Sequence, residues 1–419
     1  MKNKKYHSAD RRPRRQGMRL AVAAILLLSA QGPVFAASKN VRPEVGQPLQ
    51  AAQKALQSKN YAEAKTDIAK AEGVAKLTPY ESYLVARLKA STAIGLGDYR
   101  SALAAYELVV NSSELPDGEK IQTLDSYVKL AYTAKDYARA ASAIQVYRTA
   151  GGSDAQTLGL YAQCLYLTGR YSEASETLES EIRSAEAAGR RPSDTQLQLL
   201  ANCALKRNDM NAYTVALEKV VFYTPKPNYW IDLILRTAAK PGFSTKLDLD
   251  VYRLRKATGT MENAGDYMDA AQLALQAGFP NEAKAFVDEG YARQLLGVGA
   301  DAQRDARLKA MVDKKLSDDR ATLAEGEKAA AAQANGDALV ATGFNLVTYG
   351  QGDKGLQLMQ QGIAKGNLKD ASQAQLHLGY AQMLAGKKDL AARTLVAVKG
   401  TDGSANLARL WAIKLRSGV

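Results

Sequence analysis

Few side chains in this sequence stand at spacings that could support catalysis. Beyond residue 36 the chain contains one histidine, His377, which immediately precedes Leu378 and Gly379. General acid–base catalysis and zinc binding both require further His, Cys or carboxylate side chains at set distances, and the sequence shows no such spacing around this histidine. We therefore interpret His377 as a surface or groove residue of a helix, and we expect no enzymatic activity, metal or cofactor.

The two cysteines, Cys164 and Cys203, could form a disulfide in an oxidising compartment. Each lies seven residues before the residue that begins the next helix, Tyr171 or Met210, so they occupy equivalent positions of consecutive helix pairs. Equivalent positions in stacked helices lie roughly 8–10 Å or more apart, beyond the Cα separation of about 7 Å that a disulfide tolerates. We expect two buried thiols.

The net charge of +13 suggests nucleic-acid binding until its distribution is considered. The first 36 residues carry eight Lys or Arg and one Asp, which leaves 48 basic and 42 acidic residues and a net charge of +6 for the remainder. This excess forms no basic stripe, so we do not expect nucleic-acid binding.

Gly95 and Gly97 resemble the start of a dinucleotide-binding loop. However, Arg100 replaces the third glycine and a helix precedes them, which indicates an ordinary turn.

Residues 1–36 have the features of a secretory signal. A basic start is followed by an apolar run from Leu20 to Ala30 and by a small-residue site that ends at Ala36. The apolar run is shorter than the roughly 20 residues that span a bilayer. We expect export through the general pathway, cleavage after Ala36, a periplasmic location and no membrane insertion of the mature chain, with Met18 as a second possible start.

One helical pattern recurs along the chain. Any side chain that binds a ligand must therefore be positioned by helices. An aromatic residue is followed by Ala three residues later and by a large apolar residue four further on, which places all three on one helical face. The pattern occurs at Tyr61/Ala64/Ile68, Tyr99/Ala102/Tyr106, Tyr137/Ala140/Ile144 and Tyr171/Ala174/Leu178. The alanines are 38, 38 and 34 residues apart, which indicates a repeat protein built from helix pairs.

These segments resemble the second helix of the tetratricopeptide repeat. The first-helix residues that correspond to the family's Trp, Leu, Gly and Tyr are Leu158, Tyr161, Ala162 and Leu165. The order of several segments is also similar to that of a family of proteobacterial periplasmic tetratricopeptide proteins assigned to TonB energy-transduction systems. These segments are residues 77–81, 112–120, 189–193, 224–230 and 273–283. The resemblance implies an all-α, superhelical solenoid of antiparallel helix pairs, about nine in number, with a capping helix.

The expected organisation has five parts. They are a signal peptide (1–36), a flexible lead (37–47), an N-terminal repeat array (48–227), a degenerate helical middle (228–334) and a C-terminal pair of repeats with a capping helix (335–419). In the middle we expect helices over 228–239 and 246–257, and two longer helices that meet near Ser317. The capping helix is expected over 405–415.

The resemblance also assigns a groove to the first helices. Its positions are Arg87, Ser91, Lys129, Tyr132, Gln163, Tyr166, Asn202 and Lys206. A mixture of Tyr, amide and cationic side chains suits an extended or helical peptide. For any one of these residues, a solvated helix position is the simpler interpretation. Ser91 stands where the family's carboxylate clamp requires Asn, which argues against that clamp.

These patterns predict a non-enzymatic periplasmic scaffold that binds a protein or peptide, associated with a TonB-type energy-transduction or transport system. A chaperone or assembly factor for envelope secretion or polysaccharide export is the alternative. A third hypothesis, an enzyme with a site in the irregular middle, requires polar residues between Arg236 and Asp266 to close into a pocket. The repeat itself does not specify the partner or the oligomeric state.

Overall fold

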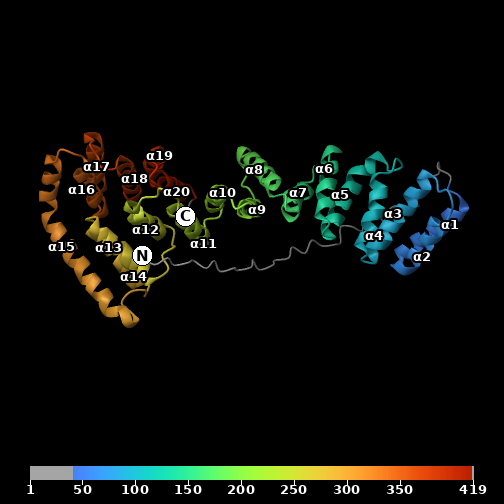
Figure 1. The fold of residues 1–419 in the computed structure, drawn as a ribbon, viewed down its shortest axis with the longest axis horizontal. Helices are drawn as coiled ribbons and strands as arrows, with labels where there is room; N and C mark the ends of the chain where they lie inside the picture. The colour runs from blue at the N-terminus through green and yellow to red at the C-terminus, as the bar shows by residue number, and fades with distance from the viewer. Residues whose placement is uncertain (1–40, 418–419) are drawn as a thin grey trace. The chain divides into compact units, whose positions relative to one another are not determined.

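The computed structural model describes residues 41–417, so the expected signal peptide lies outside the described residues. This part of the chain forms twenty α-helices and no β-strand (Figure 1). It divides into unit 1, which ends at Ala174, and unit 2, which begins at Ser175; helix α8 (Tyr171–Ala187) begins in unit 1 and continues in unit 2.

Unit 1 is a stack of helix pairs in sequence order. Its helices are α1 (Pro43–Gln57), α2 (Tyr61–Glu72), α3 (Pro79–Gly95), α4 (Tyr99–Val110), α5 (Asp117–Thr133), α6 (Tyr137–Thr149) and α7 (Ala155–Leu167). The repeated alanines Ala64, Ala102 and Ala140 are fully buried where the paired helices meet. Small residues at such contacts allow helix axes to approach to about 8–10 Å. These contacts confirm the expected all-α fold of antiparallel helix pairs.

The starts of the second helices α2, α4 and α6 are set by capping side chains. Asn60, Asp98 and Asp136 each accept a hydrogen bond from the backbone N–H three residues later, as N-caps do. Gly97, in the turn before α4, has a φ of +72°, which glycine adopts without strain. Gly97 therefore lies in a turn between paired helices, directly after α3 ends at Gly95, as expected.

The first helix begins earlier than the sequence predicted. Helix α1 starts at Pro43, so most of the described end of the expected flexible lead, 37–47, is helical. Proline is favoured at the first position of a helix, and Val45 and Leu49 are buried one turn apart. The preceding Arg42 is held by Glu81 of α3, which fixes the start of the helix.

Unit 2 continues the pairs and adds a single long helix. Its helices are α9 (Asp194–Lys206), α10 (Met210–Tyr223), α11 (Pro227–Ala238), α12 (Asp248–Ala257), α13 (Ala264–Gln276), α14 (Pro280–Ala292), α15 (Ala302–Ala332), α16 (Asp337–Thr348), α17 (Gly352–Lys365), α18 (Ala371–Leu384), α19 (Lys388–Ala397) and α20 (Ser404–Arg416). Short 3₁₀ segments, Thr245–Leu247 and Gly299–Asp301, precede α12 and α15. The two helices expected in the irregular middle are α11 and α12.

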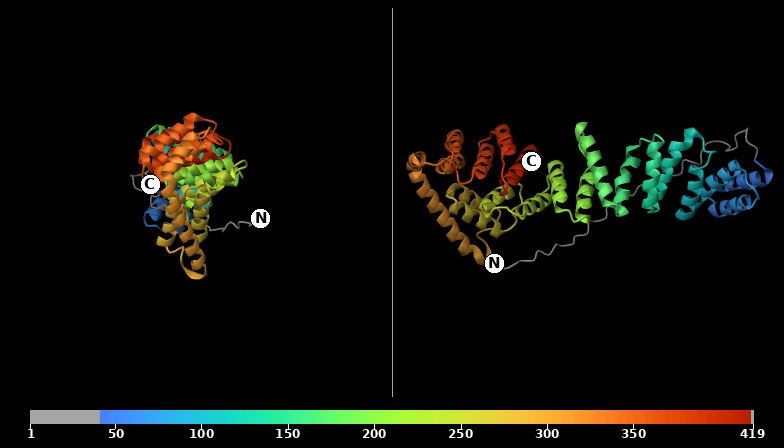
Figure 2. Two further views of the ribbon diagram at one scale, coloured as in Figure 1. Left: turned by 90° about the vertical axis from the view of Figure 1, so that its left-hand side faces the viewer. Right: turned by 45° about the horizontal axis from the view of Figure 1, so that its top comes forward.

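Helix α15 corrects the prediction of two helices that meet near Ser317. It has 31 residues. Figure 2 shows its orange ribbon as one continuous helix. Its interior contains no proline and consists largely of Ala, Lys, Arg, Glu and Leu, which are strong helix formers. The buried residues Leu308, Val312 and Leu316 continue one apolar face up to Ser317, so nothing interrupts the helix there.

The C-terminal helix does more than cap an open end. Helix α20 packs on α18 and α19, and also on α10, α11 and α12, so the red C-terminal helices lie against earlier helices of unit 2 (Figures 1 and 2). Arg409 of α20 donates from Nε to Glu218 of α10 at 2.8 Å, and Ser244 donates its backbone N–H to the Asp402 carbonyl at 2.8 Å. Unit 2 is therefore closed on itself by contacts between residues far apart in sequence.

Candidate binding surfaces

Six of the eight predicted groove residues lie on three first helices of unit 1. Arg87 and Ser91 belong to α3, Lys129 and Tyr132 to α5, and Gln163 and Tyr166 to α7, and all six are half-buried. Arg87 reaches Glu119 of α5 at 3.2 Å, and the Tyr132 hydroxyl donates to Gln163 Oε1 at 2.9 Å. These contacts link α3 to α5 and α5 to α7; we call these six residues the first-helix face.

The charges of the first-helix face are balanced locally. Arg87 is paired with Glu119, and the Lys129 ammonium lies 2.6 Å from Asp125. The Ser91 hydroxyl donates to the Arg87 carbonyl at 3.3 Å. Since Arg87 is already neutralised and Ser91 bonds to its own helix, these two side chains are not arranged as a carboxylate clamp. The face presents tyrosine rings and polar groups with little net charge.

The other two predicted groove residues, Asn202 and Lys206, are exposed on α9, which belongs to unit 2.

Unit 1 also contains a hollow that the sequence did not indicate. It has a volume of about 500 Å³ and lies between α4, α5 and α6, lined in part by Leu124, Tyr127, Arg139 and Val146. None of the predicted groove residues lines it. One of its lining residues, Val146, is a large apolar side chain that does not pack between the helices and is 53% exposed. An apolar residue off the buried face of α6 was the one feature of the sequence that pointed to this hollow.

The interior of unit 2 is built around a buried arginine. The Arg253 side chain of α12 is 1% exposed, and its guanidinium donates to both carboxylate oxygens of Glu282 at 2.8 and 2.6 Å. It also donates to Asp250 at 2.7 Å. Aromatic rings surround the guanidinium carbon, with centroid distances of 4.6 Å to Phe344, 5.3 Å to Phe279 and 5.5 Å to Tyr380. A buried charge needs ion pairs and hydrogen bonds to offset its desolvation, and the ring contacts add a cation–π attraction.

His377 belongs to this cluster, which corrects its interpretation as a surface or groove residue. Its side chain is 14% exposed, and Nε2 lies 3.0 Å from Asp250 Oδ1 and 3.0 Å from an Arg253 terminal nitrogen. Burial alone would raise the pKa of Asp250, but His377 and Arg253 hold it well below its ordinary value. The groups are arranged as a charge network that joins α12, α14 and α18.

Sequence reasoning missed this network, although α12 carries a sign of it. Asp250 and Arg253 are one turn apart, and both lie among the buried residues Leu249 and Leu254. Charged residues on the apolar face of a helix predict a buried ion pair. Their partners on α14 and α18 could not be found in this way, because they lie 29 and 124 residues from Arg253.

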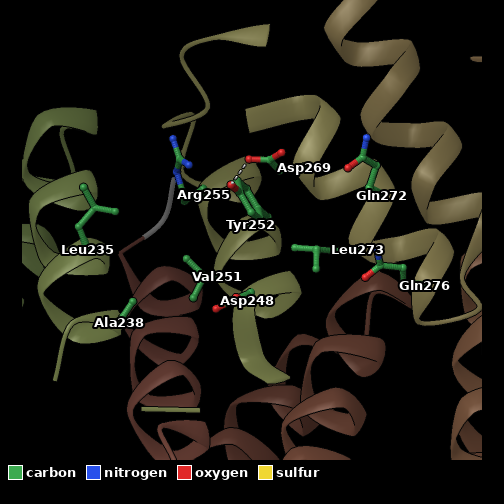
Figure 3. Close-up of a pocket in the computed structure, with 10 residues that line it drawn as sticks. All are labelled: Leu235, Ala238, Asp248, Val251, Tyr252, Arg255, Asp269, Gln272, Leu273 and Gln276. Carbon is green, nitrogen blue, oxygen red and sulfur yellow. Dashed lines mark hydrogen bonds between the residues drawn. The ribbon is translucent and has the colours of Figure 1, made fainter. Parts of the chain in front are cut away.

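A pocket of about 370 Å³ opens on the opposite side of α12 (Figure 3). It is lined by Leu235 and Ala238 of α11, by Asp248, Val251, Tyr252 and Arg255 of α12, and by Asp269, Gln272, Leu273 and Gln276 of α13. We call it the α12 pocket.

The polar groups of the α12 pocket are partly fixed. The Tyr252 hydroxyl donates to Asp269 at 3.3 Å, and the Arg255 guanidinium binds both carboxylate oxygens of Asp266 at 2.7 and 2.6 Å. Burial and the nearby Asp269 raise the pKa of Tyr252 to about 12, and burial raises the pKa of Asp248.

The third hypothesis, an enzyme site in the irregular middle, required such a pocket. Polar residues between Arg236 and Asp266 do contribute to one, but its lining contains no His, Cys, Ser or Lys. Its titratable groups are Asp248, Asp269 and Tyr252, and carboxylates and phenols are also among the side chains that act as general acids or bases.

Three features, metal-ligand groups, membrane-spanning helices and cysteines, concern residues 41–417 only. Between residues 41 and 417, no three His, Cys, Asp or Glu side chains are grouped as a metal site would need. No helix in this range is both long and apolar enough to cross a bilayer. Cys164 and Cys203 are free and buried, as expected.

Comparisons with known proteins add little. No family model and no curated protein matches the chain. Among solved structures, the crystal structure of yeast Tom70 is similar over 88% of this chain and 94% of that chain, with 12% sequence identity and a TM-score of 0.24. None of these comparisons supports the resemblance to proteins of TonB systems.

Proposed function

We propose that this chain is a non-enzymatic scaffold that binds a polypeptide on the first-helix face of unit 1. The observation that carries the proposal is the row of half-buried tyrosine, amide and ion-paired side chains that continues across α3, α5 and α7. Such a row extends over several helices, as an elongated polypeptide ligand requires.

The chemistry of this face favours polypeptide over nucleic acid. Tyr132 and Tyr166 provide rigid contact area, and each packs edge-on against a second tyrosine, Tyr137 and Tyr171 respectively. The amide of Gln163 can bond a peptide backbone as donor or acceptor. Arg87 and Lys129 are already neutralised by carboxylates, so they offer little to a phosphate backbone.

The proposal also names a cellular location and a partner system. We place the mature chain in the periplasm, as an accessory of a TonB-type envelope system, on the basis of the pattern in residues 1–36 and of the segment order in 77–283. Mass spectrometry of the exported chain tests the first point, since cleavage after Ala36 predicts a mature chain that begins at Ala37.

Site-specific photo-crosslinking in intact cells tests the binding face. A photoreactive phenylalanine at Tyr166 should give an adduct with one partner in stoichiometric amount, because this ring lies on the proposed contact surface. The matched control is the same residue at Gln145, which is exposed on the second helix α6. An adduct at Gln145 but not at Tyr166 would contradict the proposal. Many weak adducts at Tyr166 would favour the chaperone instead.

A further inference from the structure

The α12 pocket contains carboxylates without cationic partners. Among residues 41–417, no Lys, Arg or His side chain lies within ion-pair distance of Asp248 or Asp269. The one cation in the lining, Arg255, is already bound by both oxygens of Asp266. The lining therefore carries two exposed carboxylates that have no ion-pair partner among the described residues.

The rest of the lining is complementary to an alkyl chain. Leu235, Val251 and Leu273 converge on the pocket from three helices, as Figure 3 shows. Lysine and arginine bury their methylene stems on apolar surface while the charged head reaches a polar rim. Asp248 and Asp269 are exposed beside this lining, so the charged head of such a side chain can reach them.

Two glutamines favour a polypeptide over a free amine. Gln272 and Gln276 are exposed and one turn apart on α13, beside the apolar lining. A side-chain amide can donate to a backbone carbonyl and accept from a backbone N–H, so this pair can align a peptide whose side chain enters the pocket. A small amine has no group that would use them in this way.

We propose that the α12 pocket receives a lysine or arginine side chain of a partner polypeptide. This surface belongs to unit 2 and stands independently of the first-helix face, so either proposal can fail without the other.

The test uses methyl groups of the full chain as reporters in NMR. The probe is the capped tripeptide Ala-Lys-Ala, and its titration should shift the methyl resonances of Leu235, Val251 and Leu273. The same peptide with norleucine in place of lysine should shift them much less, because it keeps the stem and loses the charge. Changing Asp248→Asn and Asp269→Asn should weaken binding roughly fivefold for each carboxylate. Added salt should weaken it further.

Controls separate this site from general electrostatic attraction. Asp318→Asn removes an exposed carboxylate of α15 outside the pocket and should leave binding unchanged. Both pocket variants retain the shape of the side chain, and unchanged melting curves would show that they fold. Equal shifts with the norleucine peptide, or unchanged binding by the double variant, would overturn the proposal. Tighter binding of putrescine than of the lysine peptide would overturn it too, in favour of a small-amine site.

Discussion

Arg253 is tolerated in the interior because every side of its guanidinium meets a compensating group. Two carboxylates satisfy its donors and three aromatic rings cover its faces. Taking any one ion out of water costs several kcal/mol, so such a network is stable only while it is complete. It also depends on a helix packing that brings α12, α14, α16 and α18 together, and so it specifies that packing.

Changing Arg253→Met should therefore destabilise unit 2 by about 3–5 kcal/mol, because Asp250 and Glu282 would remain buried without their cation. Urea unfolding followed by tryptophan fluorescence measures this directly, since the chain's two tryptophans, Trp230 and Trp411, both lie buried in unit 2. Arg307→Met removes an exposed arginine of α15 as the control and should change stability by less than about 0.5 kcal/mol. A loss no larger than that of the control would contradict the account of the network.

At the scale of the elements, Glu81 joins two helices. It completes a capping box with Thr78 at the start of α3, where the Thr78 backbone N–H donates to Glu81 at 2.8 Å. Its carboxylate also accepts from the Arg42 backbone N–H at 3.0 Å and from the Arg42 guanidinium at 2.8 Å. One carboxylate therefore fixes the start of α1 and the start of α3.

This contact predicts a pH dependence. Hydrogen bonds from Arg42, together with backbone bonds, lower the pKa of Glu81 to about 2. The folded value lies below the unfolded value of about 4.3, so the stabilisation is complete above that pH and is lost as pH falls toward about 2. The stability difference between the wild type and Glu81→Gln, measured by urea unfolding with circular dichroism, should shrink from about pH 6 to about pH 3. A constant difference would argue against this linkage; Glu63→Gln, an exposed change on α2, is the control.

Over the whole molecule, the sequence predicted the helices, because helices depend on local patterns of residues. The recurring aromatic and alanine positions predicted the paired helices, and Asn60, Asp98 and Asp136 lie where their caps belong. The prediction of two helices that meet near Ser317 was wrong, because strong helix formers on both sides of Ser317 continue a single helix. The packing of α20 on α10–α12 and the contact of Arg253 with His377 join distant segments, and no local periodicity encodes them.

The division into two units can be tested through one buried alanine. Ala140 is fully buried between α5 and α6, so Ala140→Arg should cost at least about 1–3 kcal/mol through overpacking, with a further cost for the buried charge. Because both tryptophans lie in unit 2, the circular dichroism transition should move to lower urea while the fluorescence midpoint stays in place. Ala138→Arg, on the exposed side of α6, should move neither. An unchanged circular dichroism curve would mean that the repeat register is wrong, and equal shifts in both signals would mean that the chain unfolds as one cooperative body.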